Sequence, residues 1–200
     1  MFILYSLIVG LILGLILGGR PLAIGELRIR WGLLIAAGLA VQIILFSDAV
    51  AARVGDLGPA LYVGSTLMVG VAILRNVTIP GIPLVLLGAI SNMTAILANG
   101  GFMPTAPGAA AALGKSAPVI YSNSAFVARP AFEPLTDLFA LPAWMPFANV
   151  FSIGDVLIGI GVVVLMATTM RRSPRRSAGM SGGEYNRPAE RSTAPGASGH

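Results

Sequence analysis

Asp155 is the acidic residue whose position most needs an explanation. It lies within an apolar run, Ser152-Ile-Gly-Asp155-Val-Leu-Ile-Gly-Ile-Gly. An ionisable side chain in the middle of a membrane helix costs about 2.5 to 3.5 kcal/mol, so a compensating interaction is expected. If the helix begins at Ser152, the Ser-x-x-Asp spacing forms a capping box and places Asp155 at a membrane surface. If the helix begins at Asn149 instead, Asp155 lies more than one turn inside and a buried functional carboxylate is expected.

Asp137 supplies a second carboxylate, in the segment Pro134-Leu-Thr-Asp137-Leu-Phe-Ala-Leu-Pro142. Two carboxylates that meet at a membrane surface can share a proton, so that one acts as an acid and the other as a base on a water molecule. The chain between Asp137 and Asp155 is long enough to turn back and bring them together. The sequence therefore predicts a catalytic pair, or alternatively a solvated turn residue and an unrelated helix cap.

A third cluster, of amides and glycines, is predicted to bind a ligand at the outer face together with Ser152. Asn92 and Asn99 are seven residues apart and share one helix face, from which both amides can point into a bundle. Gly100 and Gly101 end this helix and allow a tight turn. The alternative is that the amides only join helices and that the glycines only form a C-cap.

The composition excludes several classes of site. Cysteine is absent and the only histidine is His200, the last residue, so we expect no cofactor and no metal site. Of the thirteen basic residues, six lie behind the last apolar run, at Arg171, Arg172, Arg175, Arg176, Arg187 and Arg191. This basic tail suits anionic lipid headgroups, so membrane lipids rather than nucleic acid are the expected partners.

The apolar runs that carry or flank these residues predict an all-α, polytopic membrane helix bundle. The chain has 200 residues, of which 56% are hydrophobic and only 10% charged, with a mean hydropathy of +0.84. A soluble domain needs roughly 25% charged residues to cover its surface. We expect a transmembrane domain over residues 1–170 and a disordered basic tail over 171–200. The domain has about five transmembrane helices, at 2–19, 31–47, 60–74, 82–98 and 150–170.

Two further features of this bundle are predicted. Gly10, Gly14 and Gly18 recur every four residues in the first helix, and so present bare backbone to which another helix can approach closely. The long outer loop, 99–149, is rich in Pro, Ala and Ser, and a connection of this length is expected to fold back on the bundle. Within it we expect one or two short interfacial helices, above all one over 134–140.

The distribution of arginines predicts the orientation in the cell membrane. Arg20, Arg28 and Arg30 follow the first helix, Arg75 follows the third, and the basic tail follows the fifth. With five spans these segments lie on one side, which the positive-inside rule makes cytoplasmic. The N-terminus and the long loop are then outside.

Three segments resemble an uncharacterised bacterial multi-pass membrane family of unknown function. These are Asn99-Gly-Gly-Phe-Met-Pro104, Leu135-Thr-Asp137 to Pro142, and Val150-Phe-Ser-Ile-Gly-Asp155-Val-Leu-Ile-Gly-Ile-Gly161. A fainter local similarity is to the lipoprotein signal peptidase, which pairs a V-V-D-F-I-type motif with a later F-N-x-A-D-x-x-I-x-x-G motif. That resemblance implies an intramembrane aspartyl hydrolase with Asp137 and Asp155 as its catalytic pair.

The leading expectation is thus a membrane protein of undetermined function with a binding site on its outer face. The first alternative is the aspartyl hydrolase. The second is a small proton-coupled transporter component in which Asp155 is the proton site. No substrate or oligomeric state follows from the sequence.

Overall fold

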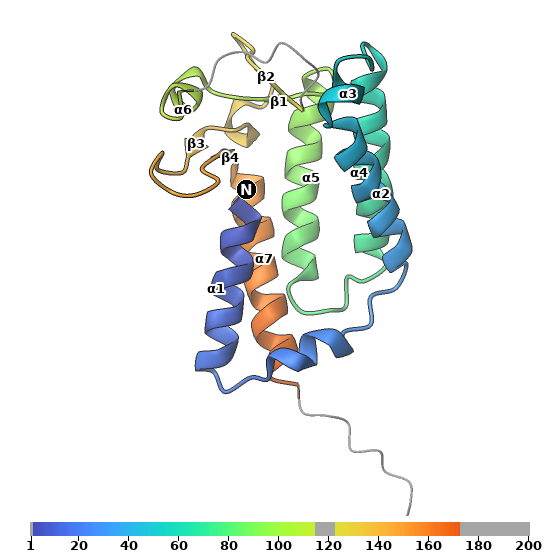
Figure 1. The fold of residues 1–200 in the computed structure, drawn as a ribbon, viewed down its shortest axis with the longest axis vertical. Coiled ribbons are helices and arrows are strands. Elements are labelled where there is room, and N and C mark those ends of the chain that lie inside the picture. Colours follow the sequence, from blue (N-terminus) through green and yellow to red (C-terminus); the bar gives the residue numbers. More distant parts are fainter. Residues whose placement is uncertain (1, 115–122, 173–200) are drawn as a thin grey trace, which may run out of the picture.

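The structure, a computed structural model, describes residues 2–114 and 123–172. Its longest helices are α1 (Phe2–Ile16), α2 (Gly32–Leu45), α4 (Leu57–Leu74), α5 (Ile82–Ala98) and α7 (Ile153–Met170) (Figure 1). Shorter helices are η1 (Pro21–Glu26), α3 (Asp48–Ala51), α6 (Pro107–Ala111) and η2 (Glu133–Leu135). The strands β1 (Met103–Pro104), β2 (Ser124–Ala125), β3 (Phe139–Ala140) and β4 (Val150–Phe151) have two residues each.

The long helices form one bundle with two parts. On one side α1 packs along α7, and α7 packs along α5. On the other side α2 packs along α4, and a smaller contact between α4 and α5 joins the two parts (Figure 1). The helix α7 therefore lies between α1 and α5.

Small residues fill much of the interior of the bundle, whereas many large aliphatic side chains face outward; Leu45, Ile96 and Met170 are among the large residues that are buried. In α1 the buried residues are Ser6, Gly10 and Gly14, while Ile16 of the same helix is 75% exposed. In α2, likewise, Leu33 is 88% exposed. This is the reverse of the arrangement in a water-soluble domain, which buries its leucines and isoleucines.

Glycines bring α5 and α7 into backbone contact. A Cβ atom added to Gly88 would lie 2.3 Å from the carbonyl oxygen of Gly154, and one added to Gly81 would lie 2.2 Å from that of Gly161. Any side chain at these positions would push the two helices apart. Gly159 lies on a different face of α7 and packs against α1.

The glycine series in the first helix meets α7 at two of its three positions. A Cβ atom at Gly10 would lie 2.9 Å from the Met166 Cβ, and one at Gly14 would lie 2.3 Å from the Met170 Sδ. Gly18 lies beyond the end of α1, in a left-handed turn with φ +74° and open space around it. The predicted helix 2–19 is therefore too long, because this turn ends α1 at Ile16.

The long loop folds over one end of the bundle. β1 pairs in parallel with β2, and β3 pairs antiparallel with β4. The predicted helix over 134–140 is wrong, since only the single turn of η2 forms there. The Asp137 N–H donates to the Pro104 carbonyl at 3.0 Å, and the Asp137 carbonyl accepts from the Ala106 N–H at 3.0 Å. These backbone groups are thus used in strand pairing rather than in a helix.

The other predicted segments differ from the helices mainly at their ends. The run 82–98 coincides with α5, and 31–47 contains α2. The run 60–74 starts three residues after α4 begins, and 150–170 starts too early because Val150 and Phe151 form β4. By length and composition α4 and α7 are able to cross a membrane, whereas α1, α2 and α5 are apolar but shorter. Residues 173–200 of the predicted tail lie outside the described residues.

Candidate functional site

The helix α7 begins with a reciprocal cap made by Ser152 and Asp155. The Ser152 Oγ accepts a hydrogen bond from the Asp155 N–H at 3.1 Å, and the Asp155 Oδ2 accepts one from the Ser152 N–H at 3.1 Å. The capping box predicted from the Ser-x-x-Asp spacing is therefore confirmed. Because the helix begins here rather than at Asn149, Asp155 lies in its first turn.

Asn92 of α5 completes a closed hydrogen-bond network with this cap. Its Nδ2 donates to the Asp155 Oδ1 at 2.9 Å, and its Oδ1 accepts from the Ser152 Oγ at 2.8 Å. Since a carboxylate only accepts, the amide must turn its NH₂ group toward Asp155 and its oxygen toward the serine hydroxyl. Ser152 is fully buried, so this network is shielded from solvent on the side of the serine.

The close approach of α5 and α7 positions Asn92 against the cap. A Cβ atom at Gly154 would lie only 1.9 Å from the Asn92 Oδ1. Gly88, one turn before Asn92 in α5, meets the backbone of Gly154 in the same contact. The glycines therefore set the distance at which the amide can reach Asp155.

Asp137 reaches the same region from the loop. It is only 7% exposed, and its backbone pairs with the residues on either side of Thr105. Strand pairing thus holds Asp137 in place although it belongs to no long element. The buried position excludes the solvated turn residue that was the alternative interpretation.

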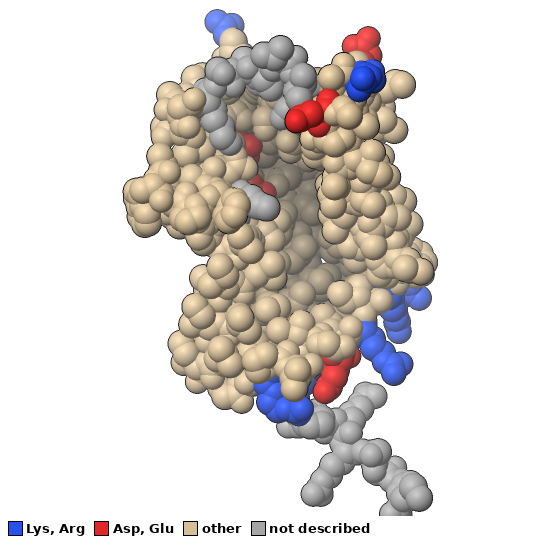
Figure 2. Space-filling view, viewed as in Figure 1, with Lys and Arg blue, Asp and Glu red and all other residues tan. Residues whose placement is uncertain are grey.

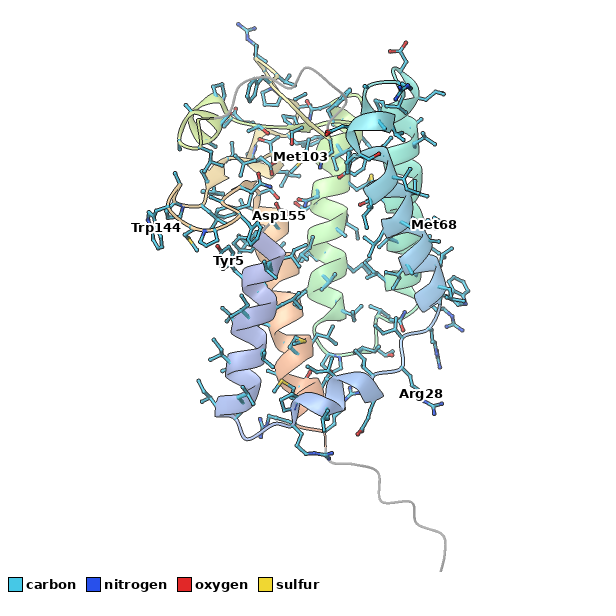
Figure 3. All side chains as sticks on the ribbon, in the orientation of Figure 1. Tyr5, Arg28, Met68, Met103, Trp144 and Asp155 are labelled. Carbon is cyan, nitrogen blue, oxygen red and sulfur yellow. The ribbon has the colours of Figure 1, made fainter. Side chains whose placement is uncertain are left out.

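Asp137 and Asp155 both line one cavity of about 520 Å³. Its polar wall also holds Asn92, Tyr62 of α4 and Asn123, whereas α1 contributes an aliphatic wall. Figure 2 shows a hollow between the two parts of the bundle with acidic atoms inside it. Figure 3 shows Asp155 at the start of α7, below Met103, which also lines the cavity.

This wall can accept hydrogen bonds and exchange protons. Carboxylates from two separate elements face one space, which suits either the binding of a hydrogen-bond donor or general acid–base chemistry. Within residues 2–114 and 123–172, no three His, Cys, Asp or Glu side chains are grouped so as to hold a metal ion.

The profile of one protein family matches residues 26–167, well over half of the chain, and spans the segments that carry both aspartates and Asn92. The chain belongs to the DUF5317 family. This family has no known function. The match begins after α1, although α1 lines the cavity. No curated protein and no solved structure matches the DUF5317 chain.

The remaining predicted binding residues of this DUF5317 protein lie away from the cavity wall. Asn99 is the C-cap of α5, and its side chain both donates to and accepts from the backbone of Ala131 at 2.9 Å. Gly100 and Gly101 form a left-handed turn after the helix, in which Gly101 packs against Pro59. These three residues anchor the loop to the bundle.

Sequence reasoning missed several residues of the DUF5317 cavity. Tyr62 is 9% exposed, and its hydroxyl accepts a hydrogen bond from the Asn123 Nδ2 at 3.4 Å. A phenol hydroxyl inside an apolar run was a usable signal for Tyr62, because such a group needs a partner. Asn123 and Asn149, in contrast, are ordinary polar residues of a loop and carry no comparable signal. Leu7 was hidden among the many similar aliphatic residues of the first helix.

Proposed function

We propose that this DUF5317 protein is an integral membrane protein with five spans that binds a membrane-resident ligand in the cavity at the outer end of its bundle. The cavity carries the proposal. Its volume of about 520 Å³ lies within the usual range of small-molecule sites, roughly 300 to 1,000 Å³. A few convergent polar groups and an apolar wall are also typical of such sites.

The pattern of side-chain burial supports the proposal that the helix bundle lies in a membrane. In the most apolar windows of α4 and α7 only 22% and 33% of the residues are buried, whereas the core helix of a soluble domain would be mostly buried. Small residues at the contacts between helices, with leucine and isoleucine outside, are what packing in lipid favours. Exposed apolar surface on this scale is unusual for a soluble monomer.

The shorter helices are compatible with five spans. At 1.5 Å per residue, the 17 residues of α5 extend about 26 Å and the 14 of α2 about 21 Å. A bilayer accommodates α5, a few ångströms short of its ~30 Å core, by local thinning. The helix α2 is about 9 Å short, so its span also needs the apolar flanking residues Trp31 and Phe46. Trp31 at the start of α2 and Trp144 between β3 and β4 are 54% and 82% exposed, as interfacial tryptophans would be.

Arginines support the proposed orientation. The Arg20 N–H donates to the Met170 carbonyl, and the Arg30 N–H donates to the Asn76 side chain, so the chain segments that carry basic residues meet at one end. Figure 2 shows most of the basic side chains at that end. By the positive-inside rule it is cytoplasmic, where the basic tail would meet anionic headgroups, and the cavity faces outward.

Complementation of a deletion strain tests the binding site. Leu7 lines the cavity and Leu13 does not, although both lie on α1 and are 40% and 38% exposed. Leu7→Trp should fill the cavity and abolish complementation at normal protein level, while Leu13→Trp should complement fully. Full complementation by a well-expressed Leu7→Trp variant would contradict a functional cavity.

The placement of both carboxylates on one cavity favours a second candidate, the aspartyl hydrolase. One carboxylate would take a proton from water while the other, protonated, would donate to the substrate oxygen. Mass spectrometry of amphiphiles that copurify with the protein separates the two candidates. A binding protein retains its ligand in the wild type and loses it in Asp155→Asn. A hydrolase instead accumulates intact substrate in Asp155→Asn and not in the wild type.

A further inference from the structure

We infer that the ligand is a membrane amphiphile with a positively charged amino group, which enters the cavity sideways between α1 and α4. This inference rests on the proposed binding function and names the chemical class of the ligand. It follows from three properties of the cavity, which are its charge, its free hydrogen-bonding capacity and the position of its apolar wall.

The ionisable side chains described in the cavity wall are mainly acidic. Asp137 and Asp155 line it, and among the described lining residues there is no lysine or arginine. The described basic residues of the loop end, Arg53 and Arg129, are exposed and lie outside the lining. An anionic group in the cavity would face two carboxylates in a partly desolvated space, where like charges repel most strongly.

The hydrogen-bonding capacity left around Asp155 is for acceptance. Each Asp155 oxygen accepts one hydrogen bond within the network, although a carboxylate has about four acceptor positions. One N–H of Asn92 donates to Asp155 and the Ser152 hydroxyl donates to Asn92, so the acceptor positions that remain in this network are mainly those of the Asp155 carboxylate. An ammonium group, which has three donors and no acceptor, complements such a wall.

The apolar wall lies where a hydrocarbon chain would enter. Phe2, Ile3, Leu4 and Leu7 of α1 line the cavity, and the three aliphatic residues among them are 36% to 44% exposed. The hollow in Figure 2 lies between the α1 side and the α4 side of the bundle. A chain lying along α1 would therefore keep its tail in the bilayer while its head group meets the aspartates.

A competition experiment tests the ligand class. The full-length protein in uncharged maltoside micelles at neutral pH is mixed with equal amounts of dodecylamine, dodecanol and dodecanoic acid. Native mass spectrometry distinguishes the three adducts by mass. We expect the amine to bind about tenfold more than either competitor, the ratio for 1.4 kcal/mol from one charge pair. Asp137→Asn and Asp155→Asn should each lower the preference for the amine severalfold, with folding checked by thermal unfolding in the same micelles.

One matched control variant, one cavity-filling variant and the pattern of binding decide the result. Asp56→Asn should keep the preference, because Asp56 is exposed, lies at the same end and does not line the cavity. The wild type could instead bind all three probes equally, and Leu7→Trp could abolish that binding. This result would overturn the proposal of a cationic ligand and leave the binding function of the cavity standing. Absence of any binding to the wild type would overturn both. An amine preference that survives in folded Asp137→Asn and Asp155→Asn would place the site elsewhere and overturn the inference.

Discussion

Asp155 uses both carboxylate oxygens, one for the cap of α7 and one for Asn92 on α5. The cap alone would tolerate asparagine, which has one acceptor oxygen. The additional bond from Asn92 changes this expectation, because an amide at position 155 would present an NH₂ group to another NH₂ group. One polar group of the network then stays unmatched whichever way Asn92 turns.

Exchanging the two side chains between the helices tests this reasoning. Asp155→Asn alone should cost about 1 to 3 kcal/mol for the unmatched polar group, and Asn92→Asp alone should destabilise by placing two carboxylates together. In the double variant a carboxylate on α5 accepts from the serine hydroxyl and from the new amide on α7, and that amide accepts from the Ser152 N–H. All four hydrogen bonds are restored.

Thermal unfolding of the four proteins in mild detergent gives the coupling between the two positions. We expect the double variant to be more stable than either single variant, with a coupling energy of about 1 to 3 kcal/mol. If the two losses add instead, Asn92 and Asp155 do not act on each other and the network does not hold the helices together.

At the residue scale, the sequence predicted only interactions between residues that are close together in the chain. The capping box follows from a spacing of three residues, and it is present. The bond between Asn92 and Asp155 joins residues 63 apart, and nothing in either segment specifies the other as its partner. The contribution of Asp137 depends on strand pairing with the distant residues Pro104 and Ala106, so its type was informative but its location was not.

At the scale of elements, α7 holds the bundle together through glycines on two of its faces. Gly154 and Gly161 meet α5, whereas Gly159 meets α1. Residues 154 and 161 are seven apart and share a face, and residue 159 lies on another, as a period of 3.6 requires. This arrangement lets one helix touch two others at backbone distance.

Alanine at Gly88 tests the backbone contact between α5 and α7. Gly88→Ala should destabilise by about 1 to 3 kcal/mol, since its Cβ would lie 2.3 Å from a carbonyl oxygen that cannot move alone. Gly64→Ala in α4 is the matched control, because nothing lies within 4 Å of the Cβ position there. Unfolding in detergent should show the control unchanged or slightly stabilised. An equal loss in both variants would mean that the close contact of Gly88 with α7 is not responsible, because alanine by itself favours the helix.

The whole molecule is polarised, with most of its described arginines at one end and its cavity at the other (Figure 2). The chain contains no cysteine, so single cysteines report the orientation without background. A membrane-impermeant maleimide added to intact cells should label Arg53→Cys and not Arg75→Cys, while both should react after permeabilisation. These two positions flank α4, so the pair also tests whether this helix crosses the membrane. The opposite pattern would invert the orientation, and labelling of both in intact cells would show that α4 does not cross.

At this scale the apolar runs predicted the five long helices to within a few residues, because burial in lipid and helix formation both follow local composition. The path of the loop was not predictable in the same way. Its segment over 134–140 has a local pattern compatible with a helix, yet Asp137 pairs with Thr105 and β3 pairs with β4. Which helices become neighbours was also open, since glycine spacing indicates a contact surface but not its partner.

The pairing of α1 with α7 has a consequence for biosynthesis. The first long helix of the described chain finds its main partner in the last long helix of that chain. Its small-residue surface at Gly10 and Gly14 must therefore remain without α7 while residues 17–152 are synthesised. Contacts between such distant segments form late, and until then the cavity lacks the wall on which Asp155 stands. With the helices spanning a membrane as proposed above, a chain stopped before α7 would leave α1 as an unassembled helix in the bilayer, open to quality-control proteases or to association with other proteins.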